Sequence, residues 1–430
     1  MLKRVLAQQD EPDPLLKQLN LLLEKVANLT PEALGLLRIM TLMHPTAPVS
    51  EHLLQQEISA NVAELLQKYD GDIRSTDSDN DGRQPTSRVP LTHSRYPSPG
   101  PQFVAALDEL LRTSILVRHQ TAESPAADKS GKGVSDKTMI AWIDPKFGGE
   151  RNVISRMMKD EERLHYYCVA VDLLSQAWES AKDQSNTERN FPPHADCELY
   201  IPHISSLPDI RQIHKAAGQY YTSADLQRKS LLPTKKRFVN LLHESSCHLI
   251  QTGEYVRAKE NLDLALSICR SDSGRDLSEG LLLEASLAHA RLGAESNASD
   301  VFKRYKHFHD LAVMVLESAY SQGGHGADTK ALAASHLGLA HASLLDDLPD
   351  GALWHVQTYE ATVCDVDGHL SKEYDRESVT VMIVMNQLKT IYQAWALCGL
   401  GMYAEAVEEC VEVIKERKSL FGAEDTRSDK

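Results

Sequence analysis

The chain of 430 residues is long enough for two or three domains, and 42% of its residues are hydrophobic, which suffices for a sizeable core. It carries 46 Lys and Arg against 61 Asp and Glu, and the resulting net charge of -15 repels phosphate backbones and anionic lipid headgroups. We therefore expect neither a nucleic-acid-binding nor a membrane-binding protein.

The seven cysteines are scattered and never spaced as C-x-x-C, as is typical of reduced thiols in the cytosol. No apolar run approaches the roughly 20 residues of a membrane span, and the opening MLKRVLAQQDEPDP is too polar for a signal peptide. These features predict a cytoplasmic location.

The first predicted elements are helices. LLKQLNLLLEKVANL repeats leucine at helical spacing, and Thr30-Pro31-Glu32 then supplies an N-cap with proline at the first helical position. The next helix, EALGLLRIMTLM, is nearly all apolar and should lie in a core. His44-Pro45 ends it, and a further helix is expected near Ser50.

Polar and small residues replace large aliphatics over residues 70–101, which predicts a disordered insertion. An amphipathic helix is expected at 103–115, followed by two β-like runs, LVRH and TMIAWI, with a long polar turn at 121–137 between them. Three helices and a hairpin describe a winged helix, so residues 1–145 are expected to form a winged-helix-like domain.

The insertion contains DSDNDG, in which Asp77, Asp79, Asp81 and Gly82 match the first half of a calcium-binding loop. The twelfth position of such a loop needs a bidentate glutamate, and this chain has Arg88 there. We therefore interpret the stretch as an acidic spacer.

Residues 146–234 are expected to form a helical connector. The amphipathic stretch EERLHYYCVAVDLLSQAWESA predicts a helix, and the prolines of FPPHADCELYIPHISSL are expected to break it. From residue 235 to 430 the pattern predicts alternating helices of about a dozen residues.

Two segments of this last region share a spaced motif. FVNLLHESSCHLIQTGEYVRAKENLDLALSICRSD and IYQAWALCGLGMYAEAVEECVEVIKERKSL both contain G-x-Y, then an alanine three residues later and a small or branched residue seven beyond that. The glycine is expected to end a first helix, the tyrosine to plug the space between paired helices, and the small residues to let the helices cross closely. The matching positions are Gly253, Tyr255, Ala258 and Ala265 in one segment, and Gly401, Tyr403, Ala406 and Val413 in the other.

This motif resembles the tetratricopeptide repeat, and two degenerate copies fit around LLLEASLAHARLG and ALAASHLGLAHASLLDDLPDGALWHV. The resemblance implies a mainly α-helical solenoid over residues 235–430. ERKSLFGAEDTRS also resembles the segment that joins repeats of the longer kinesin-light-chain type. An unrelated helical array is the alternative interpretation.

The amino-terminal half resembles a second family on the stretches LTPEALGLLRIMTLMHPTAPVSEHLL, DELLRTSILVRH, EERLHYYCVAVDLLSQAW and FPPHADCELYIPHISSL. They are similar to the part that follows the nucleotide-binding (NB-ARC) domain in fungal NOD-like receptors with tetratricopeptide repeats. The regions occur in the order winged helix, connector and then repeats, as in that family, and together they cover nearly the whole chain.

Two departures limit this resemblance. The chain has no G-x-x-x-x-G-K-[ST] phosphate loop, and SGKG at 130–133 lacks its spacing. Ala141 in TMIAWI stands where the family commonly carries a nucleotide-reading histidine. The resemblance therefore implies either the carboxy-terminal part of such a receptor or a degenerate paralogue without the nucleotide-switching motor.

No catalytic motif is present, and the candidate metal ligands are poorly arranged. His307 and His309 lie two residues apart on a predicted helix and so point to different faces. His194, Cys197 and His203 could be drawn as a ligand set, but the resemblance treats that stretch as a helix junction. We expect no enzyme activity, no cofactor and no metal.

A winged helix can read DNA, but the candidate recognition helix carries Asp108 and Glu109 against Arg112, so its face is not basic. A packing domain is the preferred interpretation, with a winged-helix transcription regulator as the weaker alternative.

Tetratricopeptide arrays bind peptides or helices in the groove lined by the first helix of each pair. Counted from the repeat frame, the groove-side candidates are Asn240, His243, His341 and Trp395. Trp395 is the expected anchor because aromatic side chains dominate interface energy. Ordinary packing between repeats is the alternative role for this residue.

The sequence as a whole predicts a non-catalytic module that recognises a protein or peptide partner through its repeats. The alternative function is a truncated or degenerate ATPase switch whose phosphate-loop domain is missing.

Overall fold

The computed structural model describes the chain in two compact units, residues 1–245 and 246–430. The residues it describes are 21, 23–44, 46–56, 100–120, 138–142, 154, 158, 160–186, 195–207, 224–271, 279–296, 299–321, 329–364 and 379–421. The predicted turn at 121–137 and, apart from its last two residues, the predicted insertion at 70–101 lie outside them.

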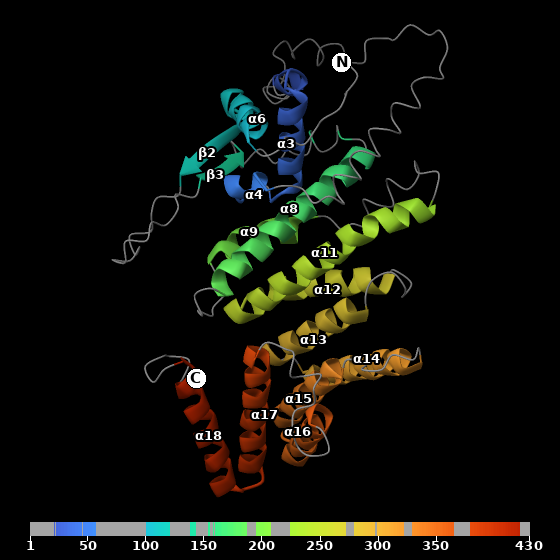
Figure 1. The fold of residues 1–430 in the computed structure, drawn as a ribbon, viewed down its shortest axis with the longest axis vertical. Coiled ribbons are helices and arrows are strands. Elements are labelled where there is room, and N and C mark those ends of the chain that lie inside the picture. The colour runs from blue at the N-terminus through green and yellow to red at the C-terminus, as the bar shows by residue number, and fades with distance from the viewer. Residues whose placement is uncertain are drawn as a thin grey trace, which may run out of the picture. The chain divides into compact units, whose positions relative to one another are not determined.

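The chain is mainly helical, as predicted (Figure 1). The elements of the first unit are α3 (Pro31–Leu42), β1 (Val49–Ser50), α4 (Glu51–Leu54), α6 (Pro101–Arg112), β2 (Leu116–Gln120), β3 (Thr138–Trp142), α8 (Asp160–Asn186), α9 (Ala195–Ser206) and most of α11 (Ala224–Thr252). Those of the second unit are α12 (Tyr255–Ser271), α13 (Glu279–Glu295), α14 (Val301–Ser321), α15 (Lys330–Leu345), α16 (Pro349–Val363), α17 (Val379–Gly399) and α18 (Tyr403–Phe421).

Helix α3 begins and ends where the sequence predicts. Thr30 is its N-cap, with the side-chain oxygen accepting a hydrogen bond from the Ala33 N–H at 3.3 Å, and the helix ends at Leu42, just before His44. The Glu109 carboxylate of α6 accepts hydrogen bonds from the Thr30 N–H at 3.0 Å and from the Thr30 hydroxyl at 2.5 Å. An acidic residue of the candidate recognition helix therefore holds the start of α3.

A three-stranded antiparallel sheet lies beside these helices. The predicted hairpin forms, with Leu116 of β2 paired with Trp142 of β3. The sequence analysis missed β1, a two-residue strand in which Val49 pairs with Ile140, and the sheet order is β1-β3-β2. A strand of two residues is too short to show an alternating pattern.

Partly buried ion pairs connect α8 to its neighbours in the first unit. The Arg38 guanidinium of α3 lies 3.5 Å from the Glu162 carboxylate and 5.6 Å from the centroid of the Tyr166 ring. Asp172, which is buried, pairs with Arg237 of α11. The predicted boundary at 234/235 thus falls within a continuous helix that is joined to α8.

Helix α8 ends at Asn186, before FPPHADCELYIPHISSL, in agreement with the expected break, but α9 forms within that stretch and continues through Pro202. His203 fixes it from one side. The His203 Nδ1 accepts a hydrogen bond from the His44 N–H at 3.1 Å, and the Nε2 lies 3.2 Å from the Pro48 carbonyl oxygen, to which it donates. The buried His203 is therefore a structural bridge, and both ring nitrogens that could bind a metal are occupied.

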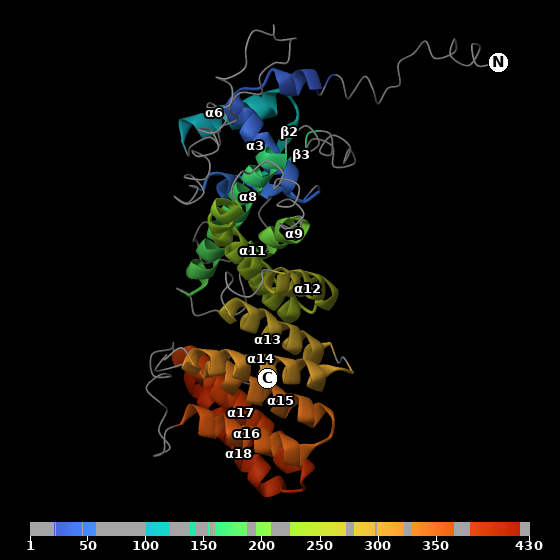
Figure 2. The ribbon, with the colours of Figure 1, turned by 90° about the vertical axis from the view of Figure 1, so that its right-hand side faces the viewer.

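The helices of the second unit are longer than the predicted dozen residues and pack in sequence order (Figure 1, Figure 2). Each packs against the next, and α15 also packs against both α13 and α17. The odd-numbered helices of this unit are thus neighbours in one layer, as expected of repeated helix pairs.

The same turn joins three helix pairs. Gly253 and Gly401, at φ 83° and 78°, follow α11 and α17 as predicted, and Asp347, at φ 57°, occupies the equivalent place after α15. In each case the left-handed residue donates to the carbonyl three residues before it, and the following residue donates to the carbonyl five residues before. The turn that the sequence marks with glycine therefore occurs a third time, at Asp347.

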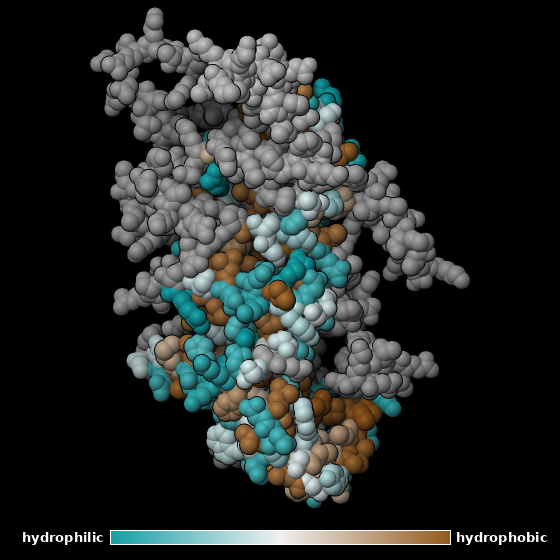
Figure 3. All heavy atoms as spheres, turned by 180° about the vertical axis from the view of Figure 1, so that it is seen from behind, coloured by the Kyte–Doolittle hydropathy of each residue, from teal (hydrophilic) through white to brown (hydrophobic). Residues whose placement is uncertain are grey.

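A buried alanine follows each of these turns by five residues. Ala258, Ala352 and Ala406 are all at most 1% exposed, as predicted for close crossing of helices. Tyr403 corrects the expectation that the tyrosine of the motif fills the space between helices, because it is 67% exposed. Figure 3 shows hydrophobic side chains at the lower right, over α17 and α18.

Tyr305 and Gly338 form a close contact between α14 and α15. Tyr305 is buried among Ala290, Leu339 and Ala342. A Cβ added at Gly338 would lie 2.1 Å from the Tyr305 Cδ1 atom. Only glycine fits there without displacing the ring.

None of the helices described is both long and apolar enough to cross a membrane.

Because Gly338 leaves no room for a Cβ atom beside the Tyr305 ring, substituting Gly338→Ala should lower the free energy of unfolding by about 1–3 kcal/mol, the usual cost of overpacking. Urea denaturation followed by circular dichroism measures this change. Gly351→Ala is the matched control, because the nearest atom to its added Cβ would be the Ser343 Oγ at 3.6 Å. Alanine should be neutral or stabilising there by about 0.5–1 kcal/mol. Equal effects of the two substitutions would contradict the packing described.

Candidate functional site

An aromatic cluster joins α15 to α17. The His341 ring stacks on the Tyr392 ring, with centroids 5.1 Å apart and planes inclined by 13°. The Trp395 ring lies 6.2 Å from His341 and is tilted by 54°. Because Trp395 remains 45% exposed, it presents much of its indole to solvent beside the His341 ring. We call these three residues the His341 surface.

Burial sets the protonation states within the His341 surface. It lowers the pKa of His341, an effect that the nearby Glu295 carboxylate of α13 opposes. Burial also raises the pKa of Tyr392 to about 12, while Arg291 acts to lower it and Glu295 to raise it. Both rings are therefore neutral at pH 7, and the charges that act on their pKa values are an opposite pair on α13.

The four predicted groove residues fall on α11, α15 and α17, the first helices of their pairs. His341 and Trp395 are in contact. Asn240 and His243 lie on α11 in the other unit, where the Asn240 amide nitrogen lies 3.4 Å from the Glu244 Oε1. The His341 surface thus contains half of the predicted set.

The sequence analysis missed Tyr392, although a signal was available. Tyr392 precedes Trp395 by three residues, and residues at this spacing share a face of a helix. Arg291 and Glu295 lie one helical turn apart on α13, so they too share a face.

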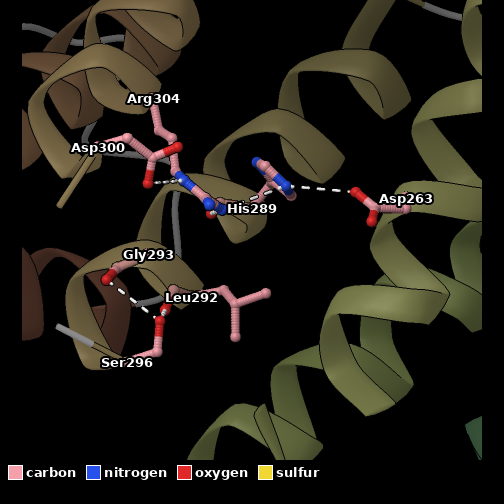
Figure 4. Close-up of polar contacts among 7 residues, drawn as sticks. All are labelled: Asp263, His289, Leu292, Gly293, Ser296, Asp300 and Arg304. Atoms are coloured by element: carbon pink, nitrogen blue, oxygen red, sulfur yellow. Dashed lines mark hydrogen bonds and ion pairs between the residues drawn. The ribbon is translucent and has the colours of Figure 1, made fainter. Parts of the chain in front are cut away.

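A polar network connects α12, α13 and α14 (Figure 4). The His289 Nε2 lies 3.4 Å from the Asp263 carboxylate and 3.3 Å from an Arg304 guanidinium nitrogen, while the Arg304 Nε donates to Asp300 at 2.8 Å. Burial lowers the pKa of His289, and Arg304 lowers it further. A Cβ at Gly293 would lie 2.8 Å from the Arg304 Cδ, so this glycine leaves room for the network.

A second histidine group lies across α14, α15 and α16. The His336 and His355 Nδ1 atoms are 3.2 Å apart, and the His309 Nδ1 lies 2.9 Å from the Ser335 hydroxyl. The His309 and His336 ring centroids are 5.0 Å apart, and Trp354 lies against both His336 and His355. One imidazole of the 3.2 Å pair donates and the other accepts, so the contact requires the accepting ring to be neutral.

Metal ligands are not assembled in the described part of the chain, where no group of three His, Cys, Asp or Glu side chains could hold an ion. His307 and His309 point to different partners, Arg270 and Ser335, as their spacing predicts. Of the other candidate set, Cys197 is buried in α9, and His194 lies outside the described residues.

Comparisons of this chain with protein-family models, with curated proteins and with solved structures find no match.

The histidine group should make stability depend on pH. Burial, with the neighbouring imidazoles, lowers the pKa of His336 and His355 from 6.5 to about 4. Between these values the unfolded chain binds more protons than the folded one, so stability is complete above pH 6.5 and is lost as the pH falls toward 4. Urea denaturation across this range measures the loss.

The double substitution of His336→Gln and His355→Gln should flatten that dependence relative to the unaltered chain. An unchanged slope between pH 6.5 and 4 would show that these two imidazoles do not carry it.

Proposed function

We propose that this chain is a non-catalytic interaction module that binds a protein or peptide partner through the His341 surface, on tetratricopeptide-like repeats. The observation that carries the proposal is the contact of His341, which stacks on Tyr392, with a Trp395 ring that stays nearly half exposed. An aromatic side chain held in place by its neighbours loses little conformational entropy on binding, which makes it an effective anchor.

The repeat assignment is supported by the recurring turn. A left-handed residue followed after five positions by a buried alanine occurs at Gly253, Asp347 and Gly401. The contacts of α15 with α13 and α17 further support a layer of first helices, which is the layer that binds ligands in tetratricopeptide arrays.

The proposal assigns a winged-helix-like fold to the residues around the sheet. Its support is the described element order α3, β1, α4, α6, β2, β3 and the strand order β1-β3-β2. We further infer a packing role for this domain, because Glu109 of α6 bonds Thr30 of α3 and is not available to a ligand.

Together these assignments favour a relationship with the carboxy-terminal half of fungal NOD-like receptors, where repeats sense a ligand. The His341 surface suits a partner with an apolar or aromatic side chain, which would rest on Trp395. Polar groups beside that side chain could pair with Arg291 and Glu295.

The proposal is tested by selecting binders from a phage-displayed library of random peptides on the full chain. Selected peptides should bind Trp395→Ala about tenfold or more weakly, the usual effect of truncating an aromatic anchor. Isothermal titration calorimetry with each synthetic peptide measures this change.

Trp354→Ala is the matched control. Trp354 is also an exposed tryptophan, but it lies on α16, a second helix of its pair. Peptides that lose affinity equally for both variants, or a library that yields no binder, would refute the proposed site.

A further inference from the structure

Helix α18 has two apolar faces. Among the elements described, it packs mainly against α17, with Ala406 and Val413 buried and the Gln393 amide donating to Glu409 at 2.9 Å. About a quarter turn around the helix lies a second set of apolar side chains, all at least 43% exposed. They are Tyr403, Val407, Val411 and Ile414, which we call the α18 stripe.

The α18 stripe has the spacing of a helix-pairing seam. Val407, Val411 and Ile414 are separated by four and three residues, the alternation that keeps side chains facing a partner helix. From Tyr403 to Ile414 the stripe is roughly 16 Å long. Figure 3 shows hydrophobic side chains gathered over this end of the second unit. Several adjoining exposed aliphatics of this kind are typical of a surface that another helix covers.

The charges beside the stripe identify the partner. Glu408 and Lys415 are seven residues apart, so they flank the stripe on the same side. More broadly, residues 405, 408 and 409 before Val411 are all acidic, whereas the charged residues after it are Lys415, Arg417 and Lys418 together with Glu412 and Glu416. The net charge of the helix therefore changes from negative to slightly positive near the middle of its own apolar stripe.

We propose that the α18 stripe pairs with the same stripe of a second copy of this chain, in an antiparallel arrangement. In the register that sets Val411 against the partner's Ile414, the two-fold axis also sets Glu408 beside the partner's Lys415, and Lys415 beside the partner's Glu408. Val411 and Ile414 thus form two apolar layers and both charge pairs are made at once, while Val407 lies beside the aliphatic part of the partner's Lys418 at either end.

Other arrangements of the two helices make fewer favourable contacts. A parallel pair would set Glu408 beside the partner's Tyr403 and Lys415 beside the partner's Cys410, so neither charge would meet an opposite charge. A seam of this length buries less surface than the roughly 1,200 Å² that stable interfaces bury. The predicted dimer is therefore weak, with a dissociation constant in the micromolar range.

The pairing uses α18, whereas the His341 surface lies on α15 and α17. Self-association and peptide binding can therefore be measured separately, and the loss of one does not imply the loss of the other.

Sedimentation velocity of the full chain between about 1 and 100 μM tests the proposal. The unaltered chain should dimerise over this range. Glu408→Lys and Lys415→Glu should each weaken dimerisation about tenfold or more, because each places two like-charged pairs in the seam. An equimolar mixture of these two variants should dimerise again, as should the double variant, because opposite charges then face each other.

Glu405→Lys is the matched control, because Glu405 is two residues from both Tyr403 and Val407 and so makes the same charge change on the side of α18 opposite the stripe, where it should leave dimerisation intact. Circular dichroism checks that every variant is folded. A chain that stays monomeric at 100 μM, as when its own residues 422–430 or another protein covers the stripe, overturns the proposal. Failure of the mixture to restore dimers overturns it equally.

Discussion

The close crossing of helices after a left-handed turn is the constraint on which the second unit depends. Ala352 follows Asp347 by five residues, just as Ala406 follows Gly401, and both alanines are buried. A larger side chain at these positions would separate the helices and expose the apolar faces between them. Where a bulky residue does occur, at Tyr305, the next helix compensates with Gly338. The combined volume of the side chains where two helices cross is thus conserved even where the G-x-Y motif is absent.

This packing also creates the candidate site. Because α15 lies against α17 as well as against α16, His341 meets Tyr392 and Trp395, residues that are some 50 positions away along the chain. The polar network around His289 connects three further helices, so the helices before the site are held by charge as well as by apolar contact. Rigid helices on both sides keep the exposed tryptophan in one place, which favours binding.

Local sequence signals predicted the local features of the fold. Thr30 and Pro31 marked the start of α3, and two glycines marked the ends of α11 and α17, because each acts within its own helix end. Asp347 escaped a search for glycine, since aspartate adopts the left-handed conformation less often. The contacts of Tyr392 and the exposure of Tyr403 depend on which helices pack against each other. The sequence pattern of one helix alone does not determine which helices these are.

Stability measured after substitution at residue 347 tests the repeated turn most directly. Since Asp347 has φ 57°, Asp347→Gly should keep or raise the free energy of unfolding, by up to about 1 kcal/mol, whereas Asp347→Val should lower it by about 1 kcal/mol or more. At the neighbouring Asp346, with φ -89°, glycine should instead destabilise. Urea denaturation gives all three values. If glycine at 347 destabilises as much as glycine at 346, residue 347 does not occupy the left-handed turn found at Gly253 and Gly401. The grouping of the helices into pairs would then be wrong.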